Sequence, residues 1–297
     1  MSVDKAQLPA GDPVLAQPVR SPSRRTSTRT ASWAARIPAV LAGVVLIFFM
    51  AAAIAPELLA PLDPLAISPA DAFAAPGAGH VLGTDESGRD IYSRIIHGAR
   101  PSLLIGAAAT AIGLGLALVL GTLAGFGGRW LDFGIGRVLE VLFALPGLLL
   151  ALVFIALAGP GVTTTVVAVG LTSAPGYARL IRGQIIALRT SPMVEAATVL
   201  GRSRMKVLGV HILPNALAPL AVLATLGLGQ AILWAASLSF LGLGSPPPAP
   251  EWGTMLSAGR TYLSLAWWMT VFPGLAIVLV AAASTVLSRA LKSGGRP

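Results

Sequence analysis

The sequence predicts an all-α integral membrane protein with six transmembrane helices. Hydrophobic residues make up 55% of the 297 residues and charged residues only 11%, whereas a soluble domain carries roughly a quarter charged residues. Six apolar runs follow one another along the chain, each long enough to cross a bilayer. A crossing needs about 20 apolar residues, and because lipid offers the backbone no hydrogen bonds, each crossing must be a helix.

Polar segments separate the six runs and set the predicted organisation of the chain. The runs cover residues 37–55, 101–126, 133–158, 162–181, 212–236 and 267–288. A basic tail precedes them, and its Pro, Ser, Thr and Arg content predicts disorder because it holds too little apolar surface to offset chain entropy. A cleaved signal peptide is the alternative, but the charged part is too long for one. The predicted parts are therefore a disordered tail at 1–36, the first transmembrane helix with an external loop at 37–99, a five-helix domain at 100–289, and a second tail at 290–297.

The segment between the first two runs is polar by the standards of this chain. Residues 56–100 contain five prolines before residue 77, and proline breaks a long helix. We expect a loop there with one short helix near 87–97. Proline also occurs within later runs, at Pro146, Pro175, Pro214 and Pro219, where it would kink or start helices.

The basic residues predict the orientation in the membrane. Six of the 21 lysines and arginines lie in the tail, two in residues 127–137, six in 179–206 and three after residue 288. If both termini are cytoplasmic, only Arg89, Arg94, Arg100 and Arg260 remain outside. Cytoplasmic loops carry an excess of Lys and Arg, so both tails are predicted to be cytoplasmic.

Composition also excludes several classes of function. The chain has no cysteine, which removes disulfides, thiolate metal sites and a cysteine nucleophile. The net charge is +9, and the basic residues lie between the apolar runs. This placement indicates a role in membrane orientation and not in nucleic-acid binding. No lysine follows a glycine, so there is no phosphate-binding loop of the G-x-x-x-x-G-K type. We expect no cofactor, no metal site and no enzymatic activity in this chain, so ATP hydrolysis would require another subunit.

Glu140 is the one carboxylate within an apolar run. A carboxylate at the centre of a membrane costs a few kcal/mol or more, and such residues often mark a transport pathway. The simpler interpretation places Glu140 near the interface, paired with Arg137 or with water. A role in lining the pathway is the alternative.

The most informative segment is the predicted inner loop between the fourth and fifth runs. Ser191 is a good N-cap and Pro192 suits the first position of a helix. Gly201 can adopt positive φ and end that helix. Three cations follow before Pro214, where the next crossing would start: Arg202, Arg204 and Lys206. The pattern predicts a short cytosolic helix, a glycine turn and a second, basic helix.

These residues resemble the EAA loop of binding-protein-dependent ABC importer permeases. The loop match consists of Glu195, Ala196, Ala197, Gly201, Pro214 and Asn215, and the loop as a whole would be residues 185–210. An external segment resembles the dipeptide, oligopeptide and nickel permease subfamily, through Gly83, Thr84, Asp85, Gly88, Arg89 and Asp90. Further stretches resemble the same subfamily: Ser237–Gly244, Pro250–Gly253 with Trp252, and Phe272–Gly274. The resemblance covers about residues 37–288 in order, but residues 287–292 lack the acid usual in the subfamily and the tail resembles nothing.

The resemblance implies a type I ABC importer permease fold and a mechanical role. Such a subunit forms half of a translocation pathway for di- or oligopeptides, with nickel chelates or other solutes as known variations. The implied partners are a second homologous permease, two cytosolic ATPase subunits, an extracytoplasmic solute-binding protein and the lipid of a bacterial plasma (inner) membrane. The short helix would be a coupling helix whose Glu195 pairs with an arginine of an ATPase.

Alternatives remain open both for the function of the whole chain and for the role of one outer loop. A stand-alone secondary carrier normally needs ionisable ligands at mid-membrane and often inverted repeats, and the sequence offers one marginal acid. The outer loop at 245–262, with Trp252, could meet the binding protein or line the pathway, or it could be a rigid turn.

Overall fold

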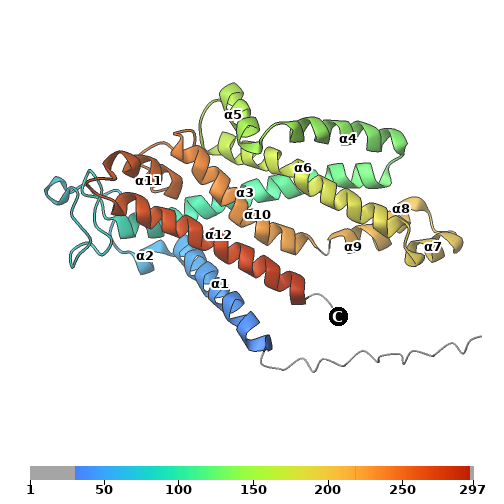
Figure 1. Ribbon diagram of the computed structural model, residues 1–297, viewed down its shortest axis with the longest axis horizontal. Coiled ribbons are helices and arrows are strands. Elements are labelled where there is room, and N and C mark those ends of the chain that lie inside the picture. The colour runs from blue at the N-terminus through green and yellow to red at the C-terminus, as the bar shows by residue number, and fades with distance from the viewer. Residues whose placement is uncertain (1–30, 218, 295–297) are drawn as a thin grey trace, which may run out of the picture.

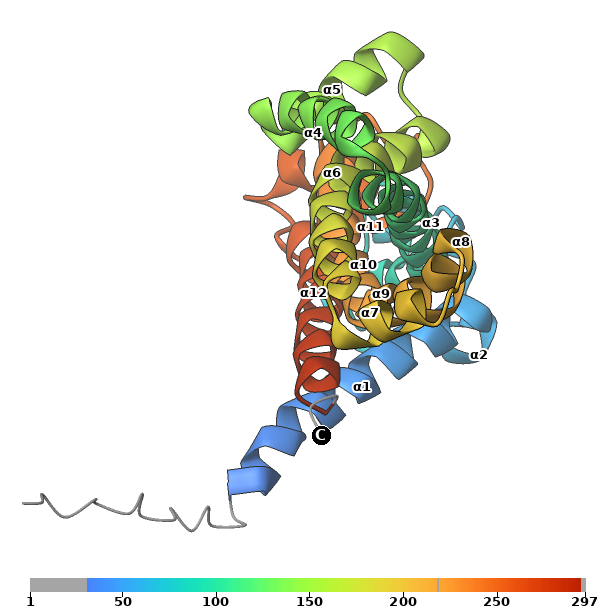
Figure 2. The ribbon, with the colours of Figure 1, turned by 90° about the vertical axis from the view of Figure 1, so that its right-hand side faces the viewer.

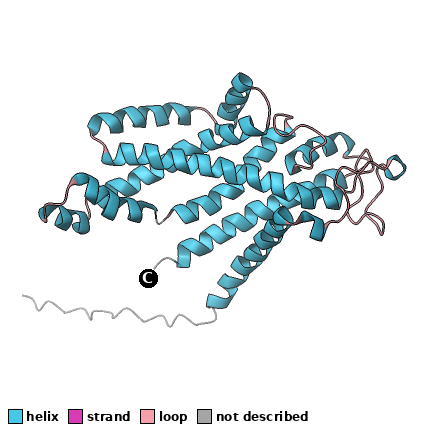
Figure 3. Ribbon diagram, turned by 180° about the vertical axis from the view of Figure 1, so that it is seen from behind, coloured by secondary structure: helices cyan, strands magenta, loops and turns pink. Residues whose placement is uncertain are grey.

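The computed structural model describes residues 31–217 and 219–294. Fifteen elements follow one another in this part of the chain, and they are α1 (Ala31–Ile54), α2 (Pro56–Leu59), η1 (Pro69–Asp71), α3 (Ile91–Phe126), α4 (Arg129–Ala144), α5 (Gly147–Ala158), α6 (Val162–Arg189), α7 (Pro192–Val199), α8 (Arg204–Val207), η2 (Leu208–Ile212), α9 (Leu213–Leu217), α10 (Leu220–Phe240), α11 (Trp252–Gly259), η3 (Arg260–Tyr262) and α12 (Trp268–Gly294). Between residues 31 and 294 the described chain is helix and loop without strands (Figure 3), apart from one isolated bridge between Thr84 and Asp90. The predicted all-α fold is confirmed.

The long helices form an elongated bundle with a loop-rich end and a helical end (Figure 1). Loop 60–90, α2 and α11 lie at one end, and α7 and α8 lie at the other. The most extensive packing joins α3 to α6, while α10 packs between α3 and α12, and α1 covers α12 and α3. The view along the long axis shows α4 and α5 on the side of the bundle opposite α1 (Figure 2). Helices α3 and α6 therefore form the centre of the molecule.

Glycines explain why α3 and α6 approach so closely. A Cβ at Gly121 would meet Ile181 and the carbonyl oxygen of Ala178, and a Cβ at Gly125 would meet Ile185. From the other side, a Cβ at Gly170 of α6 would meet Ile112. Small residues at such contacts are typical of helices that pack in membranes, where dispersion contacts replace the hydrophobic effect.

Four described helices are long and apolar enough to cross a membrane, namely α1 from Ile37, α3, α10 and α12. The predicted crossing at 133–158 is not one helix. It consists of α4 and α5, which meet at a 94° bend. If this bent pair is taken as one crossing, it is the fifth span. The break falls at Leu145 and Pro146, because proline cannot continue the hydrogen-bonding ladder of α4.

The remaining predicted crossing corresponds to α6, which has 28 residues but is less apolar than the others. Its second half carries Arg179, Arg182 and Arg189. Packing against α3, α5 and α10 covers much of this helix, so it depends less on its own hydrophobicity.

Three predicted boundaries are corrected by the structure. Helix α1 begins at Ala31, inside the segment assigned to the tail, whereas residues 1–30 lie outside the described part. Helix α3 begins at Ile91, ten residues before the predicted run, and includes most of the short helix expected near 87–97. The fifth crossing, α10, begins at Leu220 after Pro219 and not near Pro214.

Candidate functional site

The predicted short helix of the inner loop is α7, and it begins as expected. Ser191 occupies the N-cap position and Pro192 the first turn, where its missing N–H leaves nothing unpaired. The Ser191 hydroxyl, however, does not cap α7. It donates to the carbonyl oxygen of Leu188 at 2.6 Å and so closes the end of α6. The carbonyl oxygen of Ser191 accepts from the N–H groups of Val194 and Glu195, so this residue is bonded to both helices.

Gly201 ends α7 in the way the sequence predicts. Its φ is +76°, in the left-handed region that glycine adopts without strain. The Gly201 N–H donates to Thr198 O at 2.9 Å and the Arg202 N–H donates to Ala197 O at 3.1 Å. These two bonds form a Schellman motif, which satisfies carbonyls at the helix end. A Cβ at position 201 would meet nothing within 4 Å, so the requirement within this chain is conformational.

Helix α7 has one face fixed to the protein and one face free. Val194 and Ala197 are buried, at 8% and 5% exposure, in a cluster with Val207 and Ile212. Three residues of the EAA match are exposed instead: Glu195, Ala196 and Gly201. The helix therefore presents a carboxylate and small residues outward from a supported base.

Pro214 and Asn215 lie in α9, not at the start of a membrane crossing. A single π-helical turn, η2, precedes them, in which the Leu213 N–H donates to Leu208 O. The Asn215 side chain donates to His211 O at 2.6 Å. Proline removes one donor from this turn, and the Asn215 amide supplies a donor beside it. The two residues hold the irregular connection between α8 and α10.

Two arginines connect the end of α6 to neighbouring helices. Arg189, the last residue of α6, donates to Gly125 O at 2.8 Å and so binds α3. Arg182 donates to both oxygens of Asp132 in α4, at 2.5 and 2.7 Å. The loop that carries α7 thus leaves the bundle from a helix end tied to both α3 and α4.

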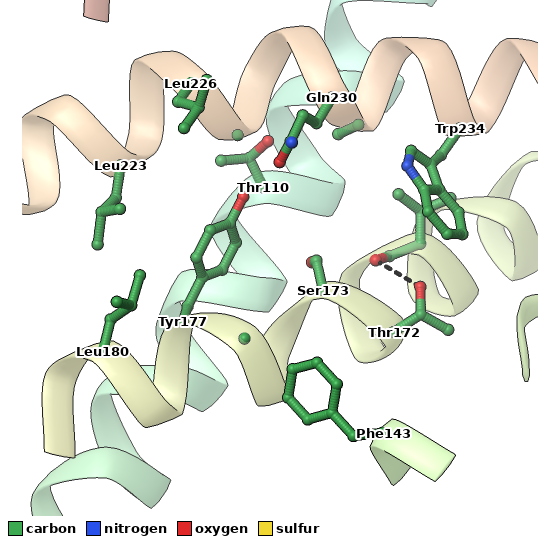
Figure 4. A pocket seen from close by; sticks show the side chains of 14 residues that line it. Thr110, Phe143, Thr172, Ser173, Tyr177, Leu180, Leu223, Leu226, Gln230 and Trp234 are labelled. Atoms are coloured by element: carbon green, nitrogen blue, oxygen red, sulfur yellow. Dashed lines mark hydrogen bonds between the residues drawn. The ribbon is translucent and has the colours of Figure 1, made fainter. Parts of the chain in front are cut away.

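A cavity of about 500 Å³ lies between α3, α6 and α10, with Phe143 of α4 at its edge (Figure 4). Its polar lining is uncharged and consists of Thr110, Thr172, Ser173, Tyr177, Gln230 and Trp234. Figure 4 shows Gln230 and the Tyr177 hydroxyl pointing toward the same space. Phe143, Leu180 and Gln230 are exposed in the single chain, so the cavity opens at its surface. A pocket of this size with a few polar groups is typical of small-molecule sites.

Sequence comparison decides the family. Residues 117–294 match the model of the family described as "binding-protein-dependent transport system inner membrane component". The chain belongs to this family. It is a membrane permease subunit, as the EAA loop predicted, and the family is one of permease subunits and not of catalytic ones.

Several named permeases are similar over most of their length. A dipeptide transport system permease protein of Alkalihalophilus pseudofirmus is 39% identical over 87% of this chain and 85% of its own. A di/tripeptide transport system permease protein of Pseudomonas aeruginosa is 45% identical over 73% of this chain and 72% of its own. A glutathione transport system permease protein of Pectobacterium atrosepticum is 39% identical over 87% and 86%.

Solved structures confirm the type I ABC importer permease fold. A chain of an amino acid ABC transporter crystallised with histidines superposes with a TM-score of 0.54, at 17% identity, over 68% of this permease and 94% of that chain. A chain of the MetNI methionine ABC transporter in an inward-facing conformation gives 0.52, at 19% identity, over 68% and 97%. At these identities the likeness concerns the fold alone.

The external motif of the permease is a tightly bonded turn. Gly83 and Gly88 both have positive φ, at +78° and +75°, and a Cβ at Gly88 would overlap the carbonyl oxygen of Ser68. Asp85 Oδ1 accepts from the backbone N–H groups of Ser87 and Arg89, at 2.8 and 2.9 Å. The Thr84 hydroxyl donates to Asp71 O at 2.5 Å. The motif thus folds the loop that precedes α3.

The last residue of the motif joins this turn to the bundle. Asp90 caps α3 by accepting from the N–H and the hydroxyl of Ser93, both at 2.8 Å, and it also contacts His80 at 3.0 Å. Arg94, one turn into α3, lies 3.7 Å from Asp85 and donates to the carbonyl oxygens of Pro64 and Pro248, both at 3.2 Å. Within this chain the motif residues have structural partners.

Trp252 packs inside the single chain, and its pathway or interface role stays a prediction. Its side chain is fully buried, its indole N–H donates to Ile95 O at 3.0 Å, and its ring meets Phe49 edge-on at 5.2 Å. Glu251 beside it caps α11 by accepting from Gly253 and Thr254. The segment predicted as a loop at 245–262 thus contains helix α11, which begins at Trp252.

Glu140 lies on the exposed side of α4, apart from the cavity lined by Gln230. It pairs with Arg137 at 2.9 Å, with both side chains about two-thirds exposed. It also borders a second hollow of about 480 Å³ together with Asp132, Arg179 and Arg182. The pairing with Arg137 matches the simpler interpretation, and a pathway role stays a prediction.

The cavity beside Gln230 was not predicted from the sequence. The sequence feature that could have indicated it is Gln230 itself, a polar side chain in the apolar run 212–236, with Trp234 one helical turn later. Nothing in the sequence brings this turn beside Tyr177, which belongs to a different run.

Proposed function

We propose that this permease forms half of the translocation pathway for di- or oligopeptides in an ATP-driven importer of a bacterial inner membrane. Both termini are cytoplasmic in this arrangement. Two cytosolic ATPase subunits supply the energy, a second homologous permease completes the pathway, and an external binding protein delivers the solute. The transport step is alternating access, in which the partners shift the population between states open to either side.

The cavity beside Gln230 supports a solute of this class. The relatives are named for dipeptides, di/tripeptides and glutathione, all of which are short peptides. A peptide offers amide donors and acceptors. The hydroxyl, indole and carboxamide groups of the cavity can form hydrogen bonds with them without placing a charged side chain in the cavity. An uncharged lining also suits a pathway that must release its solute. The exposed mouth of the cavity leaves a side for the second permease to cover.

Helix α7 would transmit force from an ATPase to the bundle against which it packs. Glu195 is exposed on a helix whose opposite face is buried against the bundle. A carboxylate in that position can accept a bidentate pair from an arginine on an ATPase. Movement of the ATPase would then reach α6, and through Arg182 and Asp132 it would reach α4, whose Phe143 borders the cavity.

The decisive experiment is transport in proteoliposomes that contain this chain, its partner permease and the two ATPases. We expect ATP-dependent accumulation of a labelled dipeptide when the binding protein is present. Unlabelled di- and tripeptides should compete, and a nickel chelate should not. Accumulation of the nickel chelate without peptide uptake would assign the other solute of the subfamily. Uptake by this chain without ATPases would refute the proposal altogether.

A further inference from the structure

A basic pocket lies beside the coupling helix, apart from the residues that would meet an ATPase. Its volume is about 230 Å³, and it is lined by three arginines, Arg189, Arg202 and Arg204, and by apolar residues that include Phe126, Val194 and Ile212. No acidic side chain lines it in the described chain. Glu195, Ala196 and Gly201 are not among its lining residues. A ligand in this pocket would therefore leave these three residues of the EAA match free.

Most of the hydrogen-bonding capacity of the three arginines is unused by the described residues. Arg189 donates once, to Gly125 O, and Arg202 has one long contact of 3.5 Å with the ring of His211. The Arg204 side chain makes no hydrogen bond or ion pair with any residue in 31–217 or 219–294, and only its carbonyl oxygen accepts a bond, from the Leu208 N–H. Each guanidinium carries five N–H donors. Three positive charges around one hollow repel one another unless an anion lies between them.

The depth of the pocket points to the membrane surface. Phe126 and Arg189 are the last residues of α3 and α6. The 28 residues of α6 give a length of about 42 Å, which matches the roughly 40–45 Å of a bilayer including its headgroups. The end of α6 thus falls at the headgroup level, and the bond from Arg189 to Gly125 O places the end of α3 beside it. Basic pockets between helices on the cytoplasmic side are the sites where anionic headgroups bind.

We propose that this pocket binds the phosphate group of an anionic phospholipid from the inner leaflet. Arg189, Arg202 and Arg204 hold the phosphate through charge-assisted hydrogen bonds, and the apolar wall contacts the glycerol and upper acyl chain. Bound there, the lipid would tie α8 to the ends of α3 and α6 and hold the base of the coupling helix. The inference rests on the proposed cytoplasmic position of this loop but not on the identity of the solute.

The test uses the full chain purified with its partner subunits, as wild type and as two double variants. R202Q/R204Q removes two charges from the pocket. R289Q/K292Q is the matched control, because it removes the same charge from exposed residues at the end of α12. Phosphatidylglycerol, phosphatidylcholine and inorganic phosphate are added separately. The readouts are the thermal unfolding midpoint and the number of bound lipids by native mass spectrometry.

We expect phosphatidylglycerol to raise the midpoint of the wild type and of the control. The apparent affinity of R202Q/R204Q should be lower by about fivefold for each arginine removed, or roughly 25-fold. Phosphatidylcholine and inorganic phosphate should have no comparable effect. An equal response of R202Q/R204Q to phosphatidylglycerol would overturn the proposal, and an equal response of the wild type to inorganic phosphate would overturn the lipid assignment. Loss of copurifying ATPase with unchanged lipid binding would assign the arginines to the ATPase interface instead. If the double variant is not recovered, R202Q and R204Q alone give the same comparison.

Discussion

Arg182 of α6 and Asp132 of α4, which are 50 residues apart in the sequence, form an ion pair with two hydrogen bonds that joins the two helices. The pair lies on the loop-bearing half of α6, whereas α4 ends near Phe143 at the edge of the cavity. This ion pair is one side-chain bridge through which a movement of α7 and α6 would reach α4. The Arg179 guanidinium, 4.3 Å from the centroid of the Phe143 ring, is another.

Breaking this pair should separate ATP hydrolysis from transport. Arg182→Lys keeps the charge but loses the planar fork, so it should impair coupling almost as much as Asp132→Asn. Both side chains are about one-third exposed, and the loss of stability should stay near 1 kcal/mol. The measurement is the ratio of peptide transported to ATP hydrolysed in proteoliposomes. Arg137→Lys, which disturbs an exposed pair on the same helix, is the control. A normal ratio in Arg182→Lys would show that α4 does not depend on this bridge.

Glu195→Lys should abolish uptake and release the ATPase subunits while the chain remains inserted. The reason is that a lysine would repel an arginine where the carboxylate would attract it. Copurification of ATPase with the tagged permease measures the effect directly. Met193→Lys places the same charge on another exposed residue of α7 and should retain more ATPase. If both variants lose the ATPase equally, charge on α7 matters but Glu195 has no special role.

Substitutions at Gly201 should follow backbone conformation and not side-chain size. Left-handed φ costs about 1–2 kcal/mol for an ordinary residue but little for asparagine. We expect Gly201→Asn to keep most of the transport activity, Gly201→Ala to lose more, and Gly201→Val to lose most. Because a Cβ here meets nothing within 4 Å of this chain, the opposite result, with asparagine worse than alanine, would indicate close approach of an ATPase backbone.

Gln230→Leu should weaken solute handling by removing the carboxamide from the cavity. Loss of one neutral hydrogen bond corresponds to about 0.5–1.5 kcal/mol, or roughly two- to tenfold in the apparent KM for peptide. Gln184→Leu makes the same change on an exposed part of α6 that does not border the cavity and should leave the KM unchanged. Equal KM values in the two variants would place the solute elsewhere.

The absence of native cysteine allows a direct test of orientation. Ala75→Cys and Leu200→Cys each introduce one thiol at an exposed position, in the predicted external loop and beside α7. In spheroplasts, a maleimide that does not cross membranes should label position 75 and should label position 200 only after the membrane is opened. The reverse pattern would invert the proposed topology.

Local signals predicted the coupling loop far better than they predicted the cavity. The start of α7 at Pro192 and its end at Gly201 follow from the conformational preferences of those two residues alone, and both predictions are confirmed. The bend at Pro146 was visible as a proline, but a proline does not reveal whether a helix kinks slightly or turns by 94°. That angle depends on how α5 packs against α6, which a single sequence does not contain.

The pairing of Arg182 with Asp132 and the grouping of Gln230 with Tyr177 escaped the sequence for the same reason. Each contact joins separate helices, and its existence depends on the rotation of each helix about its own axis. In the almost uniformly apolar α10, hydrophobic periodicity says little about that rotation. In α4 and α6 the charged positions are visible, but the sequence does not say which neighbouring helix they face. The burial of Trp252 depends in the same way on the packing of separate helices, and its pathway or interface role stays a prediction.

The glycine contacts between α3 and α6 have a consequence for the transport cycle. At Gly121, Gly125 and Gly170 the two helices pack so closely that there is no room for one more carbon atom, so a shift of one helix along the other would lose these contacts. These two helices should therefore keep the same relative placement in the outward-open and inward-open conformations. The rearrangement that switches access would then be confined to the contacts that α4, α5 and α10 make with this invariant pair.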